Sequence, residues 1–439
     1  MSGRTTTQAA SPTAAAEPEE DLTTGTVRAE QIDLADEDRN TRMTRDNQRI
    51  GAIEGLARTP EEDPYAPLGM RLGTFVFTPR LEQGIGATTN GSSSPGGGSS
   101  VFSETALRLN AISDWSRHSA ALQADGIYRK SLSGEEIDEF EGGISADIRL
   151  DLGDQWQATG SVAYRVRPES ASSPTFIEGT VSQPLRHTFS GSAGVSRELG
   201  RLKLGVTGAV ERNLYDDADL SSGGVISQAD RDSVLSTVAL RTGFELSPAI
   251  TPFLEAEIGR RNYDEEFDRD GFARSADRYA IRGGVELDLS EKTTGEFSIG
   301  WLEERPDDDR LSSISGLALA GNLQWSPVRG TIVELNGATT VEGSTTAGDP
   351  GSLLYSGSLA LRRELRANLT GTASAGLDWR DYSGSSEHDL ILSGELGLTW
   401  WMNRFVGVTG RARHEVQRSS IDDRDYDATS VFLGMTLQR

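Results

Sequence analysis

Apolar and polar residues alternate along most of the chain from residue 72 onward. The alternating segments are as long as a membrane-crossing β-strand, which needs roughly 9–11 residues. In the segment 235–246, for example, Val238 and Leu240 share one face, whereas Arg241 lies on the other. A period of two residues predicts β-strands in which one face is apolar and the other is polar or charged.

The segments are separated alternately by short and long polar connections. Eight short and nine long connections predict 18 strands, with 16 as the alternative count, and both ends of the strand domain then lie on the side of the short turns. The short turns are expected at 116–117, 153–154, 200–201, 248–249, 291–292, 327–328, 367–368 and 402–403. The long connections are expected at 90–100, 132–139, 169–182, 216–231, 264–276, 306–313, 343–352, 383–387 and 417–425.

A soluble β-sandwich would show the same period of two, with its polar faces in bulk water. A membrane barrel instead turns apolar residues toward lipid and polar residues toward a wet lumen. The aromatic residues favour the barrel, because most Tyr lie beside the long connections and most Trp beside the short turns. Two such groups are expected at the two membrane interfaces. We expect one rim to carry Tyr164, Tyr263 and Tyr355, and the other to carry Trp156, Trp325 and Trp400.

The predicted fold is therefore an all-β, closed, antiparallel up-and-down transmembrane β-barrel over residues 71–439. An open sheet edge would leave unpaired amides in lipid, so the first and last strands must pair. We expect the segment 72–88 to lie next to the segment 428–437.

Residues 1–70 have a different composition, with 7 Arg, 14 Asp or Glu and a single aromatic residue, Tyr65. Such a segment buries too little apolar surface to fold, which predicts a largely disordered, acidic periplasmic leader. It contains no apolar stretch typical of a secretory signal, so the signal peptide is either upstream or already removed.

The 439 residues carry a net charge of −24 and include no Cys. The negative charge argues against a nucleic-acid partner. The absence of Cys excludes disulfides, thiolate metal sites and Cys nucleophiles. The expected partners are outer-membrane lipids, lipopolysaccharide and the barrel assembly machinery, with peptidoglycan as a partner if the leader is a tether.

The entry segment reads Leu-Gly-Thr-Phe-Val-Phe-Thr-Pro-Arg-Leu-Glu at 72–82 and continues to Thr89 and Asn90. A Ser-Asp-Trp turn follows at 113–115. These motifs resemble the putative β-barrel porins of the outer membrane, of the α-proteobacterial type, over roughly residues 70–439. The resemblance implies a barrel in the outer membrane of a Gram-negative cell and implies no particular substrate. The chain departs from many outer-membrane proteins because it ends on Arg439 rather than on an aromatic residue.

Candidate catalytic and metal-binding residues are few. A membrane acylhydrolase needs a Ser–His pair on the lipid face, but His414 has the apolar register and Ser430 the lumen register. The stretch Asp264–Gly271 has carboxylates at alternate positions and lacks the bidentate Glu of a calcium-binding loop. The sequence therefore predicts no enzyme, no catalytic residue, no resident metal and no cofactor.

The polar face of the clearest strands supplies candidate lumen-lining residues. They are Arg165, Arg167, Arg241, Arg282, Arg411, Arg413, Glu245, Glu286 and Glu395. Rings of charge set the selectivity of pores, and a slight excess of Arg in these strands predicts a preference for anions. Alternatively, these groups pair across strands and fill the interior. The leading hypothesis is a passive diffusion pore for small solutes. The alternatives are a structural barrel that tethers the membrane to the cell wall and an exporter of surface polysaccharide.

Overall fold

The computed structural model describes residues 64–439 except 170–172, 174, 176–182, 221–222, 290–291 and 345–347. Most of the predicted leader, residues 1–63, lies outside the described residues. None of the helices in the described part of the chain is long and apolar enough to cross a membrane.

Most of the described chain is β-strand. The sheet has 19 strands, but β1 (Met70–Leu72) pairs only with the start of β2, so the barrel wall has 18. The wall strands are β2 (Phe75–Thr88), β3 (Ser100–Ser113), β4 (Ser119–Gly134), β5 (Asp138–Asp151), β6 (Trp156–Pro168), β7 (Leu185–Leu199), β8 (Leu202–Tyr215), β11 (Ser233–Phe244), β12 (Ile250–Tyr263), β13 (Ala276–Asp288), β14 (Thr293–Pro306), β15 (Ile314–Trp325), β16 (Thr331–Gly343), β17 (Gly351–Arg366), β18 (Leu369–Tyr382), β19 (His388–Trp401), β20 (Val406–Ser419) and β21 (Tyr426–Gln438). A long connection holds β9 (Ala218–Asp219), β10 (Val225–Ile226) and the 3-10 helix η1 (Ala229–Arg231).

Each wall strand pairs antiparallel with its neighbours in the chain, and β2 pairs with β21 to close the barrel. The closing register runs from Arg80 opposite Gln438 to Thr88 opposite Ser430, which confirms the predicted closure. The entry segment begins later than expected. Gly73 has a positive φ of 63°, and the turn there separates β1 from β2.

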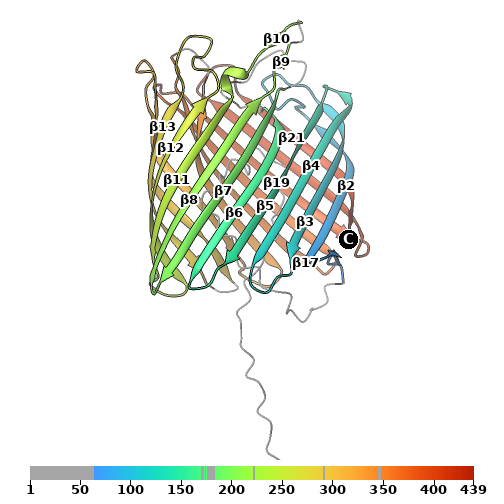
Figure 1. Ribbon diagram of the computed structural model, residues 1–439. Coiled ribbons are helices and arrows are strands. Elements are labelled where there is room, and N and C mark those ends of the chain that lie inside the picture. The colour runs from blue at the N-terminus through green and yellow to red at the C-terminus, as the bar shows by residue number, and fades with distance from the viewer. Residues whose placement is uncertain are drawn as a thin grey trace, which may run out of the picture.

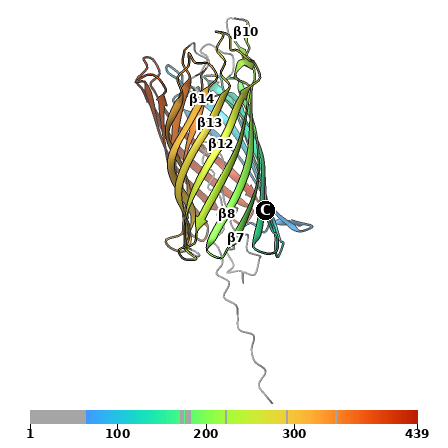
Figure 2. The same cartoon turned by 60° about the vertical axis from the view of Figure 1, so that its left-hand side comes forward.

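The nine connections that were predicted to be long lie at one end of the barrel, which we call the long-loop end, and the eight predicted short turns lie at the other, the short-turn end (Figure 1). The strands are inclined to the barrel axis, and the barrel is broader in Figure 1 than in Figure 2, so its cross-section is oval. One predicted long connection is wrong, because β4 and β5 extend over most of 132–139 and leave only 135–137 between them. Glu135 then accepts hydrogen bonds from the backbone N–H groups of Gly91 and Gly98 in the adjacent loop.

The two faces of the wall differ as the alternation predicts. Val238 and Leu240 lie outward with 51% and 57% of their surface exposed, as expected for side chains that meet lipid. Trp156, Trp325 and Trp400 are exposed at the short-turn end, as predicted.

The predicted Tyr group lies at the long-loop end, as expected: Tyr164 and Tyr263 are near the ends of β6 and β12, and Tyr355 is near the start of β17. The group does not share one face of the wall, however. Tyr164 lies outward against Phe189, with their ring centroids 4.7 Å apart. Tyr263 instead has the inward register of Glu257 and Arg261 on β12. A polar ring at a strand end can belong to either face, and the parity of the strand decides which.

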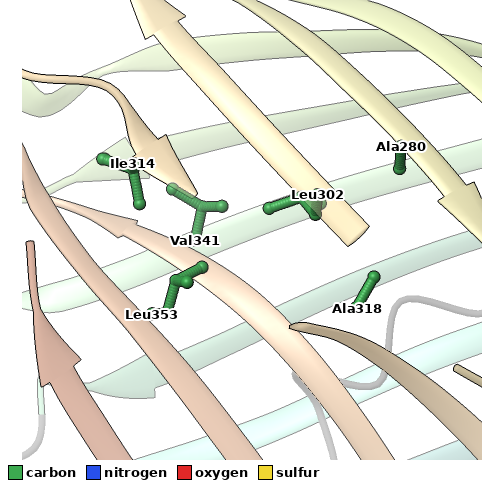
Figure 3. Packing of buried hydrophobic residues seen from close by; sticks show 6 residues of the cluster. All are labelled: Ala280, Leu302, Ile314, Ala318, Val341 and Leu353. Atoms are coloured by element: carbon green, nitrogen blue, oxygen red, sulfur yellow. The ribbon is translucent and has the colours of Figure 1, made fainter. Parts of the chain in front are cut away.

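The shortest ladder of the described wall joins β15 and β16. The ladder between β15 and β16 runs only from Ala320 opposite Ala338 to Trp325 opposite Val333. Residues 314–319 of β15 and 339–343 of β16, nearer the long-loop end, are not paired with each other, and we call this region the β15–β16 seam. Aliphatic side chains gather beside it in the one buried apolar cluster of the described residues, shown in Figure 3.

Candidate functional site

The inward face of the wall is the candidate functional site, because it surrounds the lumen. The register places the predicted candidates on the strands at inward positions, and Glu245 follows directly after β11 with the same parity. Glu245 and Glu286 together line a small cavity of about 170 Å³ near the short-turn end, beside Lys203.

The arginines of β11–β14 form a continuous ladder of ion pairs with carboxylates on neighbouring strands. Arg282 lies between Glu255 and Glu257, at nitrogen–oxygen distances of 3.0 and 2.6 Å. Arg278 lies on the same strand as Arg282, nearer the long-loop end. It bridges Glu257 and Glu304 at 2.8 Å each. Alternating charges on adjacent strands can thus satisfy each other where little water reaches them.

The ladder extends on both sides of β13. Arg241 contacts a carboxylate oxygen of Glu296 at 2.6 Å, and its guanidinium lies 3.4 Å from the centroid of the Phe253 ring. Arg261 pairs with Glu304 at 3.0 Å. The Arg241 side chain is therefore held on both sides and is not a free cation in the lumen.

The arginines near the closure of the barrel are paired as well. Arg411 contacts Glu82 at 2.9 Å and also binds Glu104. Arg413 lies 2.5 Å from Glu415 on its own strand. Arg411 and Arg413 lie on β20, next to the closing strand β21. Arg411 pairs across strands, as the alternative hypothesis expects, and Arg413 also binds a carboxylate, so a field of free arginines does not describe them.

Arg165 on β6 pairs with Asp125 on β4 at 3.2 Å, so this arginine is also neutralised by a carboxylate of another strand. Arg167 is buried and, like Glu395, takes part in further interactions with its surroundings. The candidate set as a whole is consequently a paired polar lining.

The complete inward face also carries many more carboxylates than the sequence predicted. The inward acidic residues that were missed include Glu82, Glu104, Glu139, Glu141, Glu296, Glu304, Glu334, Glu342, Asp389 and Glu415. Missed basic residues include Arg80, Arg108, Arg129, Arg149 and Arg278. The excess of Arg in the clearest strands does not hold for the whole wall, where acidic residues predominate. The missed acidic and basic residues could have been found from the sequence by taking every second residue along the less regular strands as inward.

A second buried group lies on β16, β18 and β19 near the long-loop end. Arg380 has no exposed surface and contacts Glu342 at 2.7 Å and Asp389 at 2.9 Å. Asp389 also accepts hydrogen bonds from the hydroxyls of Tyr382, at 2.8 Å, and Ser419, at 2.6 Å. This group fixes three strands to one another by charge-assisted hydrogen bonds.

Loops from distant parts of the barrel meet above the lumen at the long-loop end. Arg424, in the β20–β21 connection, donates a hydrogen bond of 2.8 Å to the carbonyl of Ser173 in the β6–β7 connection. Glu169 of the same connection pairs with Arg231 of η1. Burial raises the pKa of Glu169, but the Arg231 guanidinium and the hydroxyls of Thr175 and Ser173 outweigh burial and hold it below the ordinary value. These contacts connect the described residues of the β6–β7 connection to the β8–β11 and β20–β21 connections.

Two carboxylates of the stretch Asp264–Gly271 bind arginines or backbone N–H groups. Asp264 pairs with Arg212 at 2.5 Å. Asp268 accepts the backbone N–H of Phe272 at 2.9 Å and pairs with Arg274 at 2.5 Å. Within the residues that the structure describes, no group of three or more His, Asp or Glu is arranged to hold a metal ion.

The short-turn half of the lumen contains a cavity of about 510 Å³. Side chains of both charges line it, among them Arg149, Asp151, Lys203 and Glu286. Polar groups thus face an open space here, whereas they face one another in the long-loop half.

His414 and Ser430 do not form a catalytic pair. His414 lies outward and makes a hydrogen bond of 2.8 Å with the Thr429 hydroxyl. Ser430 lies inward on β21, opposite Thr88 and Arg413 of the flanking strands. The predicted difference in register is confirmed.

Comparison with known proteins gives one family and several barrels of low similarity. The copper transporter OprC is 9% identical, covers 84% of this chain and 81% of its own, and has a TM-score of 0.42. The outer membrane protein opdK of Pseudomonas aeruginosa is 12% identical, with 84% and 100% covered and a TM-score of 0.39. OpdQ of the same organism is 12% identical, with 86% and 100% covered and a TM-score of 0.38. No curated protein matches the chain. The model of one family matches residues 63–439, and the chain therefore belongs to the family described as Putative beta-barrel porin 2, which makes it a porin-like β-barrel of the outer membrane.

Proposed function

We propose that the protein is a passive diffusion pore for small water-soluble solutes. The observation that carries this proposal is the polar inward face of an 18-stranded wall around a cavity of about 510 Å³. Barrels with 16–18 strands are wide enough to enclose an aqueous channel. Family membership supports the same function.

The expected orientation follows from the connections. Outer-membrane barrels have short periplasmic turns and longer extracellular loops. The short-turn end with its cavity then opens to the periplasm, and the long-loop entrance faces outward beside the lipopolysaccharide. Solutes are selected at that entrance by size and, within the lumen, by the mixed charges of the wall.

The proposal is tested by single-channel recording in planar bilayers with a thiol reagent. The chain has no Cys, so single Cys variants react at one position only. Thr207 lines the cavity, whereas its neighbour Val206 lies outward. A charged, water-soluble methanethiosulfonate should lower the conductance of Thr207→Cys and leave that of Val206→Cys unchanged.

A second function has one observation in its favour. The loop contacts over the long-loop entrance, including Arg424 with Ser173, are compatible with a barrel that conducts little and instead anchors the membrane to the cell wall. Wild-type protein that inserts into the bilayer and gives no conductance steps would contradict the diffusion pore and favour this tether.

A further inference from the structure

The β15–β16 seam is the longest interruption between two neighbouring strands of the described wall; a shorter one lies between β5 and β6, over 138–141 and 167–168. On its other edge β15 pairs with β14 up to Ile314, and β16 pairs with β17 up to Gly343. The residues that do not pair across the seam therefore belong to two strands that are each held on the far side. The gap in the ladder does not reflect fraying of a single strand.

At the seam the two strands overlap instead of meeting edge to edge. Gly316 has the inward register of β15, yet a Cβ there would lie 2.5 Å from Leu353 Cδ1 and 2.6 Å from the Tyr355 hydroxyl. Leu353 and Tyr355 have the outward register of β17, opposite Val341 and Thr339 of β16. The inner face of β15 thus covers the outer face of β16 and β17. This explains why Leu353 is only 1% exposed.

A side chain replaces a missing ladder bond on the free edge of β15. The Leu319 N–H donates to the Thr339 hydroxyl at 2.9 Å. An edge amide in lipid needs a partner, so this bond helps to keep the seam closed. The Tyr355 hydroxyl lies against the same part of β15, because a Cβ on Gly316 would be 2.6 Å from it. A seam held by side chains can open without breaking a backbone ladder.

The seam also differs chemically from the rest of the lumen. The buried cluster contains Ala280 and Leu302, which lie inward on β13 and β14, and Val341 and Leu353, which lie on the membrane side of β16 and β17. Ile314 of β15 belongs to the same cluster and lies beside Val341 (Figure 3). Aliphatic side chains therefore connect the lumen with the bilayer through a wall whose other inward groups are mostly polar.

We propose that the β15–β16 seam is a lateral passage between the lumen and the outer leaflet for a single-chain amphiphile of the long-chain fatty acid class. The cluster that lines the route is aliphatic, which suits a flexible acyl chain, while the charged lumen keeps the polar head hydrated. Opening requires that the bond of the Leu319 N–H to the Thr339 hydroxyl breaks and that the acyl chain replaces the contacts of Val341 and Leu353. This passage is additional to the diffusion pore and does not depend on ion conduction.

The test uses two disulfides in the Cys-free chain. Ile314→Cys with Val341→Cys closes the seam, because both residues belong to one contact cluster. Ala320→Cys with Ala338→Cys is the matched control, since these residues pair directly on the same two strands. Cells that carry each variant in the outer membrane take up a fluorescent long-chain fatty acid under oxidising and reducing conditions. The oxidised seam variant should lose uptake to the level of cells without the protein, and reduction should restore it.

The control variant should take up the fatty acid equally under both conditions, and the conductance of both variants in planar bilayers should be the same oxidised as reduced. Thr339→Val, which removes the hydroxyl that accepts the Leu319 N–H, should raise uptake. Equal uptake by the oxidised and reduced seam variant would overturn the proposal, as would failure of its disulfide to form. Parallel loss of conductance and uptake would also overturn it, because both would then follow one axial route.

Discussion

The two halves of the lumen use the same residue types in different surroundings. In the long-loop half, Arg380 and Asp389 form an ion pair in which neither side chain is exposed. In the short-turn half, the pair of Lys203 with Glu198 leaves 25% and 52% of the side chains exposed and borders the cavity. Charged side chains on the inward face therefore have two roles. Near the long-loop end they hold strands together, and near the short-turn end they contact solvent.

The largest expected effect tests the structural role of the long-loop half. Arg380→Ala removes the cation between Glu342 and Asp389 and leaves both carboxylates buried without it, which should lower the free energy of unfolding by about 3–5 kcal/mol. The matched change in the short-turn half, Lys203→Ala, should cost less than about 1 kcal/mol, because exposed pairs are screened by water. Urea unfolding of both variants in lipid vesicles measures the two values. Equal losses would contradict the comparison.

A smaller loss of unfolding free energy is expected at the β15–β16 seam, where apolar side chains rather than ion pairs hold the long-loop half together. Gly316→Ala places a methyl group against Leu353 and Tyr355, and such overpacking should cost about 1–3 kcal/mol. Gly337→Ala, in the paired part of β16, meets only the Ser356 carbonyl at 3.7 Å and should be neutral or stabilise by less than about 1 kcal/mol. Unfolding in the same vesicles distinguishes them, and a neutral Gly316→Ala would show that the seam is not tightly packed.

Acid should weaken the structure of one loop at the long-loop end, residues 264–275, through protonation of Asp268. Burial raises the pKa of Asp268, but the Phe272 N–H and the Arg274 guanidinium outweigh burial and hold it below the ordinary value. Because the folded-state pKa is depressed, the stabilisation is present above the unfolded value of about 3.9 and is lost as the pH falls through the lower folded value. Hydrogen exchange in the loop 264–275 should therefore show unchanged protection from neutral pH down to about pH 4 and weakening below it.

The same loop provides the control for that pH response. Asp268→Asn removes the carboxylate that holds Arg274, whose guanidinium also donates to the Asp349 carbonyl of the β16–β17 connection at 2.8 Å. The variant should exchange faster at every pH and lose the acid-dependent step. Loss of protection in the wild type already between pH 7 and 5 would assign the transition to a different group.

The smallest expected effect concerns ion selectivity in the short-turn half. Since acidic residues predominate on the inward face and the arginines are paired, the pore should prefer cations slightly, which reverses the preference for anions expected from the sequence. The reversal potential in a KCl gradient measures this preference. Glu286→Gln, beside the cavity, should shift it toward anions, whereas the outward Val238→Gln should not. A wild-type preference for anions would instead support the prediction from the sequence that the inward arginines determine the ion selectivity.

Residue alternation alone was sufficient to predict the barrel. The bilayer forces a period of two and forbids an open edge, so the strand positions, the 18-strand count and the pairing of β2 with β21 could be read from local pattern and closure. The same period placed Arg241, Arg282 and Arg411 on the inward face, because a residue's parity within its strand fixes the side of the wall on which it lies.

Only the tertiary structure decided what those inward residues contact. Arg411 meets Glu104, 307 positions away in the sequence, and such a pair depends on the stagger and curvature of the closed wall. The overlap of β15 on β17 has the same origin, since it depends on how far one strand is displaced relative to its neighbours. Alternation carries no information about that displacement, because the pattern repeats identically along every strand, whereas packing and hydrogen bonding between strands determine it.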